Sequence, residues 1–476
     1  MTSLERVLSV SNDFLWTYIL IFMLIAVGIY FTFQTRFVQF RLLGEMFRLL
    51  GDGVNRKPQE KKGVSSFQAF CISAASRVGT GNLAGVAIAI AVGGPGAVFW
   101  MWVLATIGAA SSFVECTLAQ IYKVHDKHGY RGGPAYYMEK ALNKRWMGIT
   151  FAVLITLCFG FVFNAVQANT ITAAMQTAFG VDKLMMGIIL SILTGLVVFG
   201  GVKRVAAISK WIVPIMAIVY IVIALFVMLM NYQQIPAVFL SIVSHAFGLQ
   251  EAFGGGIGIA LSMGIKRGLF SNEAGMGSAP NAAATADITH PVKQGLLQTL
   301  GVYVDTLLVC SATAFIILTS GIYVDSGMGG IELTQVALSS QLGSWAVYFI
   351  AVIVFFFAYS SIIGNYYYGE TNIDFIRSES HTWMLVYRLC VIGMVMFGSL
   401  AKNDFVWTLA DLFMGMMALL NLFAIFLLGK YAYAALTDYV QQRKAGRDPV
   451  FYADSIPGLV NAECWERDPN KVKEVS

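Results

Sequence analysis

The stretch Ser76–Gly85 reads Ser-Arg-Val-Gly-Thr-Gly-Asn-Leu-Ala-Gly, and it interrupts an otherwise apolar segment of helical length. Its glycines, Gly79 and Gly81, weaken a helix at this point. The polar side chains that it would place at membrane depth are Arg77, Thr80 and Asn82. Unpaired polar groups there cost several kcal/mol, so a continuous helix facing lipid is excluded. Broken helices near the midplane form the binding sites of secondary transporters, and we therefore expect a transporter of a small zwitterionic solute.

The composition predicts an all-α integral membrane protein. Apolar residues make up 57% of the chain, charged residues 12%, and the mean hydropathy is +0.68, far from values of soluble domains. The first apolar run lacks a basic start and a cleavage site, so we expect a retained helix rather than a signal peptide. About eleven spans are expected, at residues 14–34, 65–93, 97–122, 148–178, 184–200, 211–230, 250–286, 295–320, 340–369, 383–401 and 404–428.

Basic residues alternate between loops, which predicts an orientation. With the N-terminus outside, the loops expected to be cytoplasmic contain Arg36, Arg41, Arg48, Arg56, Lys57, Lys61, Lys62, Lys123, Lys127, Arg131, Lys140, Lys144, Arg145, Lys203, Arg204 and Lys210. The opposite loops contain only Arg6, Lys183 and Lys402. The net charge of +5 thus indicates orientation and attraction to membrane lipid, with the C-terminus cytoplasmic, and nucleic acid is not expected as a partner.

No enzymatic constellation is apparent in the sequence. The six cysteines are dispersed without metal-like spacing, and the five histidines lack a paired carboxylate motif. A phosphate-binding GxxxxGK[ST] loop is absent, which disfavours an ATP-driven pump. We therefore expect neither catalytic activity, nor a metal beyond a coupling ion, nor an organic cofactor.

A second interrupted segment covers residues 254–275 and combines glycines with Lys266, Arg267 and Glu273. Each interruption leaves free N–H groups, which attract a carboxylate, and free C=O groups, which coordinate a cation. A free amino acid fits such an arrangement. Each interrupted helix also opens a group of about five spans, which is the layout of inverted repeats. Ser271, Asn272 and Glu273 are interpreted mainly as an N-terminal cap of the second half-helix.

Several sequence strings resemble those of the alanine or glycine:cation symporters. They are Val78–Ala87, Gly268–Gly277 with Ser278, Ala279 and Pro280, Gly132–Tyr137, Gln167–Asn169 and Tyr366–Glu370. The resemblance extends over nearly the whole chain. It implies the architecture of the amino acid, polyamine and cation transporters, a leucine-transporter-like five plus five inverted repeat preceded by one extra helix, with two broken helices at its centre.

The resemblance also implies an organisation and a site. Residues 1–476 would form one transmembrane domain, with the extra helix at 14–34, repeats at 65–230 and 250–428, and a cytoplasmic tail at 429–476. Substrate contacts would come from Thr80, Gly81 and Asn82, faced by Ser262 and Gly264. Sodium would lie between the carbonyl groups of Ala75 and Val78 and the hydroxyl groups of Ser360 and Ser361. The expected location is a bacterial cytoplasmic (inner) membrane.

The intramembrane charges allow alternative interpretations. Arg77 departs from the family pattern: it either pairs with Glu273 or another buried acid, or it replaces a second cation. Arg267 and Lys266 either neutralise a substrate carboxylate or pair with Glu273. Only one of Gln167 and Asn169 can point into the site, because residues two apart do not share a helix face. The remaining acids, which are relay candidates in a proton-coupled carrier or simply buried beside partners, are Glu115, Asp305 and Asp411.

The leading hypothesis is a monomeric secondary symporter that couples sodium influx to uptake of alanine or glycine by alternating access. A proton-coupled carrier, or a carrier of a larger amino acid such as glutamine, is the alternative. A channel is disfavoured, because it would need polar or charged rings along a continuous pore.

Overall fold

A computed structural model describes residues 3–55, 64–126, 129–200, 202–248, 256–324 and 327–467. Several residues discussed above lie outside this part of the chain, namely Arg56, Lys57, Lys61, Lys62, Lys127, Gly254, Gly255 and the tail beyond residue 467. The side chains of Lys203, Arg204 and Lys210 are also outside it.

Helices dominate the described part of the chain. The α-helices are α1 (Ser3–Phe14), α2 (Ile21–Gln34), α3 (Val38–Arg41), α4 (Leu43–Asn55), α5 (Ser66–Arg77), α6 (Val86–Gly93), α7 (Gly96–Ile121), α8 (Pro134–Lys140), α9 (Arg145–Ile155), α10 (Asn164–Phe179), α11 (Lys183–Val198), α12 (Val202–Met230), α13 (Ile235–Ala246), α14 (Gly256–Asn272), α15 (Ala279–Ala283), α16 (Val292–Tyr303), α17 (Ser311–Ser320), α18 (Gly330–Leu342), α19 (Trp345–Ile376), α20 (His381–Leu400) and α21 (Asn403–Lys444). Shorter π and 3-10 segments are η1 (Leu15–Leu20), η2 (Gly81–Gly85), η3 (Thr156–Phe163), η4 (Val304–Cys310), η5 (Ala453–Ser455) and η6 (Glu463–Trp465). Strands β1 (Val124–Asp126) and β2 (Gly129–Arg131) pair in one antiparallel hairpin.

The expectation of an all-α membrane protein is confirmed. Within the described ranges, seven helices are long and apolar enough to cross a membrane, or nine if each of two bent pairs counts as one span. The eleven expected spans correspond to these segments and to the shorter helices α11 and α14. The first helical segment, Glu5–Gln34, begins earlier than the expected span at 14–34.

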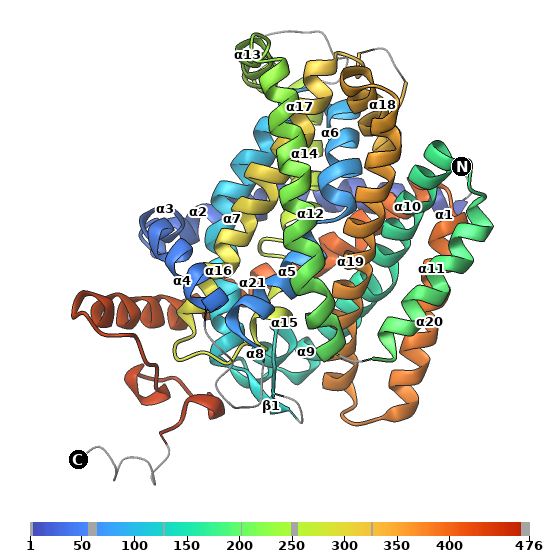
Figure 1. Cartoon of the computed structure of the whole chain (residues 1–476). Coiled ribbons are helices and arrows are strands. Elements are labelled where there is room, and N and C mark those ends of the chain that lie inside the picture. Colours follow the sequence, from blue (N-terminus) through green and yellow to red (C-terminus); the bar gives the residue numbers. More distant parts are fainter. Residues whose placement is uncertain are drawn as a thin grey trace.

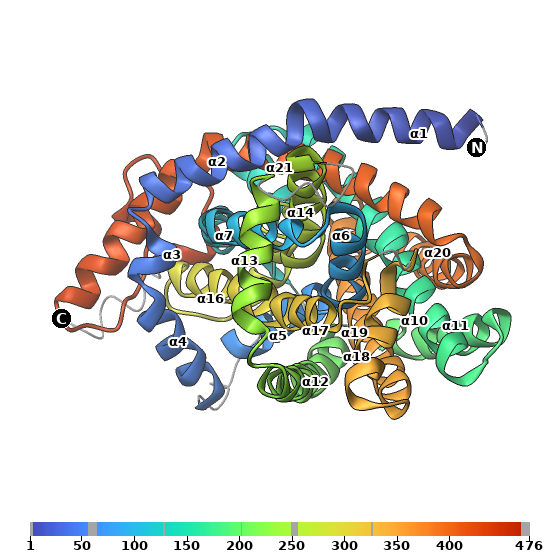
Figure 2. The ribbon, with the colours of Figure 1, turned by 90° about the horizontal axis from the view of Figure 1, so that it is seen from above.

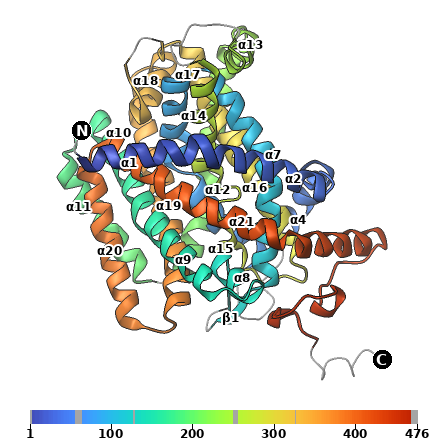
Figure 3. The same cartoon turned by 180° about the vertical axis from the view of Figure 1, so that it is seen from behind.

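The helices form a bundle whose two ends differ (Figure 1). We call the end that carries the β1–β2 hairpin and α8 the hairpin end, and the opposite end, with α13 and α18, the α18 end. The segment α1–α2 runs along one side of the bundle (Figure 2), and it crosses the bundle beside α7 and α21 (Figure 3). This extra helical segment therefore lies outside the ring of helices that surrounds the two broken segments.

The first broken segment bends by 47° between Ser66–Arg77 and Gly81–Gly93. A capping box starts α5, because the Ser65 hydroxyl accepts the Gln68 amide N–H and the Gln68 side chain accepts the Ser65 N–H. Val78 then adopts an extended conformation, with ψ of 93°. The helix resumes at Gly81, so the interruption falls at the predicted glycines.

The second broken segment is interrupted later than the sequence suggested. Helix α14 continues through Gly264 to Asn272. The chain then turns at Glu273, Gly275 and Gly277, whose φ angles are 58°, 82° and 89°. These left-handed conformations suit glycine, whereas Glu273 adopts one against its intrinsic preference. A short helix, α15, follows from Ala279.

The C-terminal segment is more ordered than an ordinary polar tail. Helix α21 continues to Lys444, well past the expected span at 404–428, and the chain after it folds back on the hairpin end. The Trp465 indole N–H donates to the carbonyl of Gln120 at 2.8 Å, and the Phe451 N–H donates to the carbonyl of Thr289 at 2.9 Å. Lys123 lies beneath the Trp465 ring, and burial lowers the pKa of this lysine to about 8. The segment 449–467 thus covers the C-terminal end of α7 and the chain before α16.

We expect Trp465→Ala to release segment 449–467 from the bundle. Loss of a buried tryptophan costs roughly 3 kcal/mol, most of it in the docking of this segment. Hydrogen exchange measured by mass spectrometry would then rise in this segment while α7 stays protected. Arg467→Ala, which removes an exposed ion pair with Asp454 and a contact with the Tyr452 ring but nothing that joins the segment to α7, is the control and should leave exchange nearly unchanged. Unaltered protection in Trp465→Ala would contradict the docking described here.

Candidate substrate and cation site

The two interruptions meet at the centre of the bundle. A methyl group placed on Gly81 would lie 3.0 Å from the Phe270 ring and 3.1 Å from Cα of Ser271, so a side chain at this position would have to push the second broken segment away by a few tenths of an ångström. Asn82 and Ser271 are also joined through Asp305. The Asn82 side-chain amide donates to one carboxylate oxygen of Asp305 at 2.7 Å, and the Ser271 hydroxyl donates to the other at 2.8 Å. Asp305 therefore connects the two broken segments.

The polar residues of the first interruption are held in place by side chains. The Asn82 carbonyl oxygen accepts the N–H of Gly79 at 2.9 Å. The Gln167 carbonyl oxygen accepts the N–H of Thr80 at 3.1 Å and also the Thr80 hydroxyl. Asn169 instead donates to the carbonyls of Gly398 and Ala401, next to α20. The structure thus assigns Gln167 to the interruption and Asn169 to helix packing.

An oxygen cluster lies between α5 and α19. The Ser361 hydroxyl is 2.9 Å from the carbonyl oxygen of Ala75 and 3.4 Å from that of Val78. Gly79 permits this contact, since a methyl group there would overlap the Ser361 hydroxyl. The Ser360 hydroxyl turns away and donates to the carbonyl of Phe357 in its own helix at 2.8 Å. Of the four residues expected at a cation site, the structure therefore brings three together.

Arg77 has no ion pair with any carboxylate of the described residues. Its guanidinium donates to the carbonyl of Gln298 at 3.1 Å and to the Ser112 hydroxyl at 3.4 Å. Gly301 makes room for it, because a side chain there would overlap the guanidinium. The expected direct pair with Glu273 is thus replaced by hydrogen bonds from the guanidinium to neutral acceptors on α16 and α7.

Glu115 of α7 is fully buried and binds the second interruption. Its two carboxylate oxygens accept the backbone N–H groups of Gly275 and Gly277, each at 3.0 Å. Asn421 donates a third hydrogen bond to the same carboxylate at 2.8 Å and also bonds the Gly275 carbonyl. The side chain of Glu115 therefore satisfies the amide groups that the turn leaves free.

The structure corrects the expected cap of the second half-helix. Ser271, Asn272 and Glu273 lie at the end of the first half-helix, and Asn272 accepts the N–H of Ala274 within the turn. Glu273 is buried and bonds two hydroxyl groups, those of Ser76 at 2.7 Å and Ser278 at 2.5 Å. Capping of the second half-helix by these three residues is wrong because the interruption begins after them.

Gly264 does not face the first interruption. Gly264 packs against the backbone of α7, where a side chain would overlap the carbonyl of Ala97. Ser262 is half-buried in the preceding turn of the same helix. The family resemblance implied substrate contacts for both residues, whereas Gly264 serves close packing against α7.

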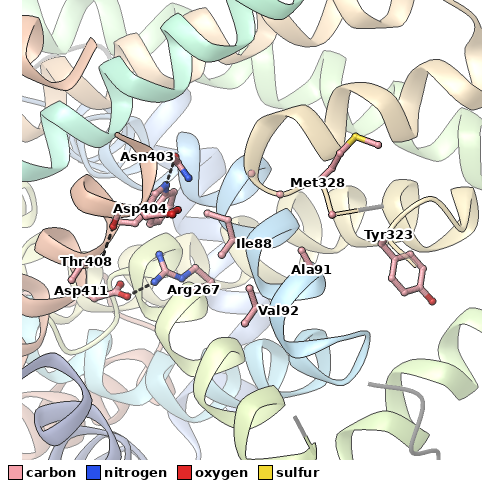
Figure 4. A pocket seen from close by; sticks show the side chains of 14 residues that line it. Ile88, Ala91, Val92, Arg267, Tyr323, Met328, Asn403, Asp404, Thr408 and Asp411 are labelled. Carbon is pink, nitrogen blue, oxygen red and sulfur yellow. Dashed lines mark hydrogen bonds and ion pairs between the residues drawn. The ribbon is translucent and has the colours of Figure 1, made fainter. Parts of the chain in front are cut away.

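A pocket of about 700 Å³ lies between α6, α18 and the start of α21, toward the α18 end (Figure 4). Arg267 and Asp411 form a buried ion pair at its wall, and this pair replaces the expected pairing of Arg267 with Glu273. The Arg267 guanidinium also lies 4.5 Å from the centre of the Trp407 ring. Lys266 points elsewhere, 5.6 Å from the ring of Trp16.

Two aromatic rings separate this pocket from the first interruption. The ring of Phe270 lies 4.6 Å from that of Trp407, which lines the pocket, and 4.4 Å from that of Phe163. On its other side Phe270 contacts Gly81. The pocket therefore ends on an aromatic layer, formed by the rings of Trp407 and Phe270, that lies between it and Gly81 of the first broken helix.

Sequence reasoning missed several contributors to this centre. Asn365 and Asn421 each bond a buried polar group from another element, and Gly301 provides the space for Arg77. Their only signal was a polar or small residue within an apolar span, which many packing residues share.

Two broken helices, a buried oxygen cluster between helices and a pocket at one end define the class of secondary transporters with the leucine-transporter-like fold. A solved structure of a Na⁺-coupled sialic acid symporter, in a substrate-bound outward-open state, supports this assignment of fold. It matches with a TM-score of 0.51 at 15% identity, over 85% of this chain and 86% of that one.

The chain belongs to the sodium:alanine symporter family, whose sequence profile matches residues 1–453. It is 56% identical to the probable sodium/glutamine symporter GlnT of Bacillus subtilis, over 97% of this chain and 96% of that protein. It is 58% identical to the amino-acid carrier protein AlsT of the same organism, over 97% and 98% of the two chains. The chain is thus a sodium-coupled amino-acid symporter and not an enzyme.

We expect Glu115→Gln to destabilise the fold. The new amide group would direct its own N–H toward the N–H of Gly275 or Gly277, leaving a buried donor unpaired at a cost of about 2 kcal/mol. The thermal midpoint of the purified protein in detergent would fall. Glu139→Gln, which weakens only a surface ion pair with Arg145, should unfold like the wild type. Equal midpoints for all three proteins would contradict the role of Glu115.

Proposed function

We propose that the chain takes up alanine or glycine together with sodium and binds both at the first interruption. The observation that carries this proposal is the juxtaposition of two different half-helix ends. The second half-helix starts at Gly81 without a side-chain cap, whereas α5 ends in carbonyl groups that face Ser361. An anionic group and a cation therefore have separate, adjacent positions.

The substrate carboxylate would accept hydrogen bonds from the amide groups at the start of the second half-helix. These groups lack acceptors inside the helix, and the helix dipole favours an anion there. Thr80 and Asn82 are held by Gln167 and Asp305, so the backbone is preorganised for this contact. The small side chain would lie against Gly81 and Phe270.

The sodium ion would be bound by the carbonyl oxygens of Ala75 and Val78 and by the Ser361 hydroxyl. Neutral oxygens are suitable ligands for a hard cation. Because Ala75 and Val78 belong to α5 and Ser361 belongs to α19, the ion would hold these helices together, and its release would let them separate. Ser360 has no direct part in this arrangement, which departs from the set expected from the sequence.

Access from the α18 end would pass through the pocket beside Arg267 and Asp411. The aromatic layer of Phe270 and Trp407 would then have to move for the substrate to reach Gly81. The α18 end would face outward and the hairpin end the cytoplasm of a bacterial cell, as the distribution of basic residues favours.

Glutamine is the second candidate substrate. It is favoured by one observation, the 56% identity to a protein named as a probable sodium/glutamine symporter. Glycine at position 81 against the ring of Phe270 favours the smaller substrates. Competition of unlabelled alanine, glycine and glutamine against uptake of labelled alanine separates the two: alanine and glycine should compete, and stronger competition by glutamine would reverse the assignment.

We expect Ser361→Ala to weaken sodium binding roughly tenfold, because one of the ligands is lost, which corresponds to about 1.4 kcal/mol. Equilibrium binding of radioactive sodium to the purified protein measures this directly. Ser360→Ala is a matched control from the adjacent position, and it should bind sodium like the wild type. If the two variants bind sodium equally well, the proposed ligand set is incorrect.

A further inference from the structure

The three buried carboxylates at the centre differ in what donates to them. Glu115 accepts three N–H groups, and Asp305 accepts one N–H group and the hydroxyls of Ser271 and Thr306. An N–H donor cannot accept a proton, so protonation of either acid would break a hydrogen bond. Among the described residues, the Glu273 carboxylate is bonded by two hydroxyl groups, those of Ser76 and Ser278, which can donate or accept.

One hydroxyl hydrogen, that of Ser76, lies between two acceptor oxygens near Glu273. The Ser76 hydroxyl lies 2.7 Å from the Glu273 carboxylate and 2.7 Å from the side-chain oxygen of Asn365, but it has one hydrogen. A proton on Glu273 completes the chain, because Glu273 then donates to Ser76 and Ser76 donates to Asn365. In the ionised state, rotation of the Asn365 amide lets its N–H donate to Ser76, which donates to Glu273. Both protonation states therefore have a satisfied arrangement.

Other buried polar atoms also surround this carboxylate. Among the described residues, the amide nitrogen of Asn365 is buried without a hydrogen-bond partner, and the Tyr368 hydroxyl faces the hydroxyls of Ser73 and Ser76. On α19, Ser361, Asn365 and Tyr368 share one face. This face continues toward the hairpin end, where Asn372 donates to Asn281 at 2.9 Å. A polar seam thus leads from the oxygen cluster past Glu273 to that end.

The net charge of the ionisable groups near Glu273 would be balanced by two additional cations. Arg77 acts electrostatically on Glu115, Glu273 and Asp305. Three ionised carboxylates and one guanidinium sum to a charge of minus two, which a low-dielectric interior disfavours. Sodium at the oxygen cluster and a proton on Glu273 would balance it. The charged or titratable groups that face Glu273 are Arg77, Asp305, Tyr368, Cys116 and Cys158.

We propose that Glu273, with Ser76 and Asn365, is a proton-binding site separate from the sodium site, and that its proton moves with the amino acid in each transport cycle. The carboxylate takes a proton from water on one side and returns it through the polar seam at the hairpin end. This inference rests on the proposed amino-acid transport only for the movement of the proton, and not for its binding.

The first test measures protonation without transport. Infrared spectra of the purified protein should contain the band of a protonated carboxylic acid, which disappears as the pH is raised. Glu273→Gln should abolish this band, and Ser76→Ala should shift the pH at which it disappears. Absence of the band in the wild type, or its persistence in Glu273→Gln, would overturn the proposal whether or not alanine is a substrate.

The second test follows the proton during transport. Proteoliposomes with a trapped pH indicator and a clamped membrane potential should acidify inside during sodium-driven alanine uptake, by about one proton per alanine. Glutamine imitates the protonated acid, so Glu273→Gln should keep uptake but lose acidification. Asp374→Asn, at the hairpin end of α19, is the control and should acidify like the wild type. Equal acidification with Glu273→Gln, or none with the wild type, would overturn the inferred coupling.

Discussion

The rest of the structure depends on the pairing of backbone groups that two broken helices expose inside a membrane. Such groups cannot reach water, so the protein supplies a buried side chain for them. Glu115 accepts the free amides of the second turn, and Gln167 and Asn82 accept those of Thr80 and Gly79. The amides at the start of η2 remain without a side-chain cap, and we propose that they bind the substrate carboxylate.

The need to pair these backbone groups also explains why the buried charged side chains have different roles. Glu115 and Asp305, whose carboxylates accept N–H groups, join separate elements and hold the architecture together. Glu273, bound by hydroxyls, can exchange a proton without losing its partners. Arg77 stabilises the three buried carboxylates electrostatically without pairing with any of them, whereas Arg267 forms an ion pair with Asp411 near the α18 end. The groups that donate to each buried carboxylate thus distinguish a structural role from a role in transport.

The sequence predicted most of the fold but only part of the site. Apolar runs reveal spans. The glycines at 79 and 81 mark the first interruption because they alternate with the polar residues Thr80 and Asn82, which helix packing alone does not require. The second interruption was set too early, because Gly264 serves contact with α7 and the turn instead begins at Glu273, a residue that rarely adopts a positive φ. The partner of Arg267, Asp411, could not be predicted from the sequence either, since this contact depends on the rotation of α14 relative to α21.

The protein is a sodium-coupled amino-acid symporter, and we propose that the sodium gradient drives amino-acid accumulation through the site at the first interruption. The most direct test of this proposal is uptake of labelled alanine into proteoliposomes under an imposed sodium gradient, with an imposed proton gradient and no gradient as parallel conditions. We expect accumulation above equilibrium whenever the sodium gradient is present, and none without any gradient. Accumulation driven by the proton gradient alone, with no response to sodium, would contradict the proposal.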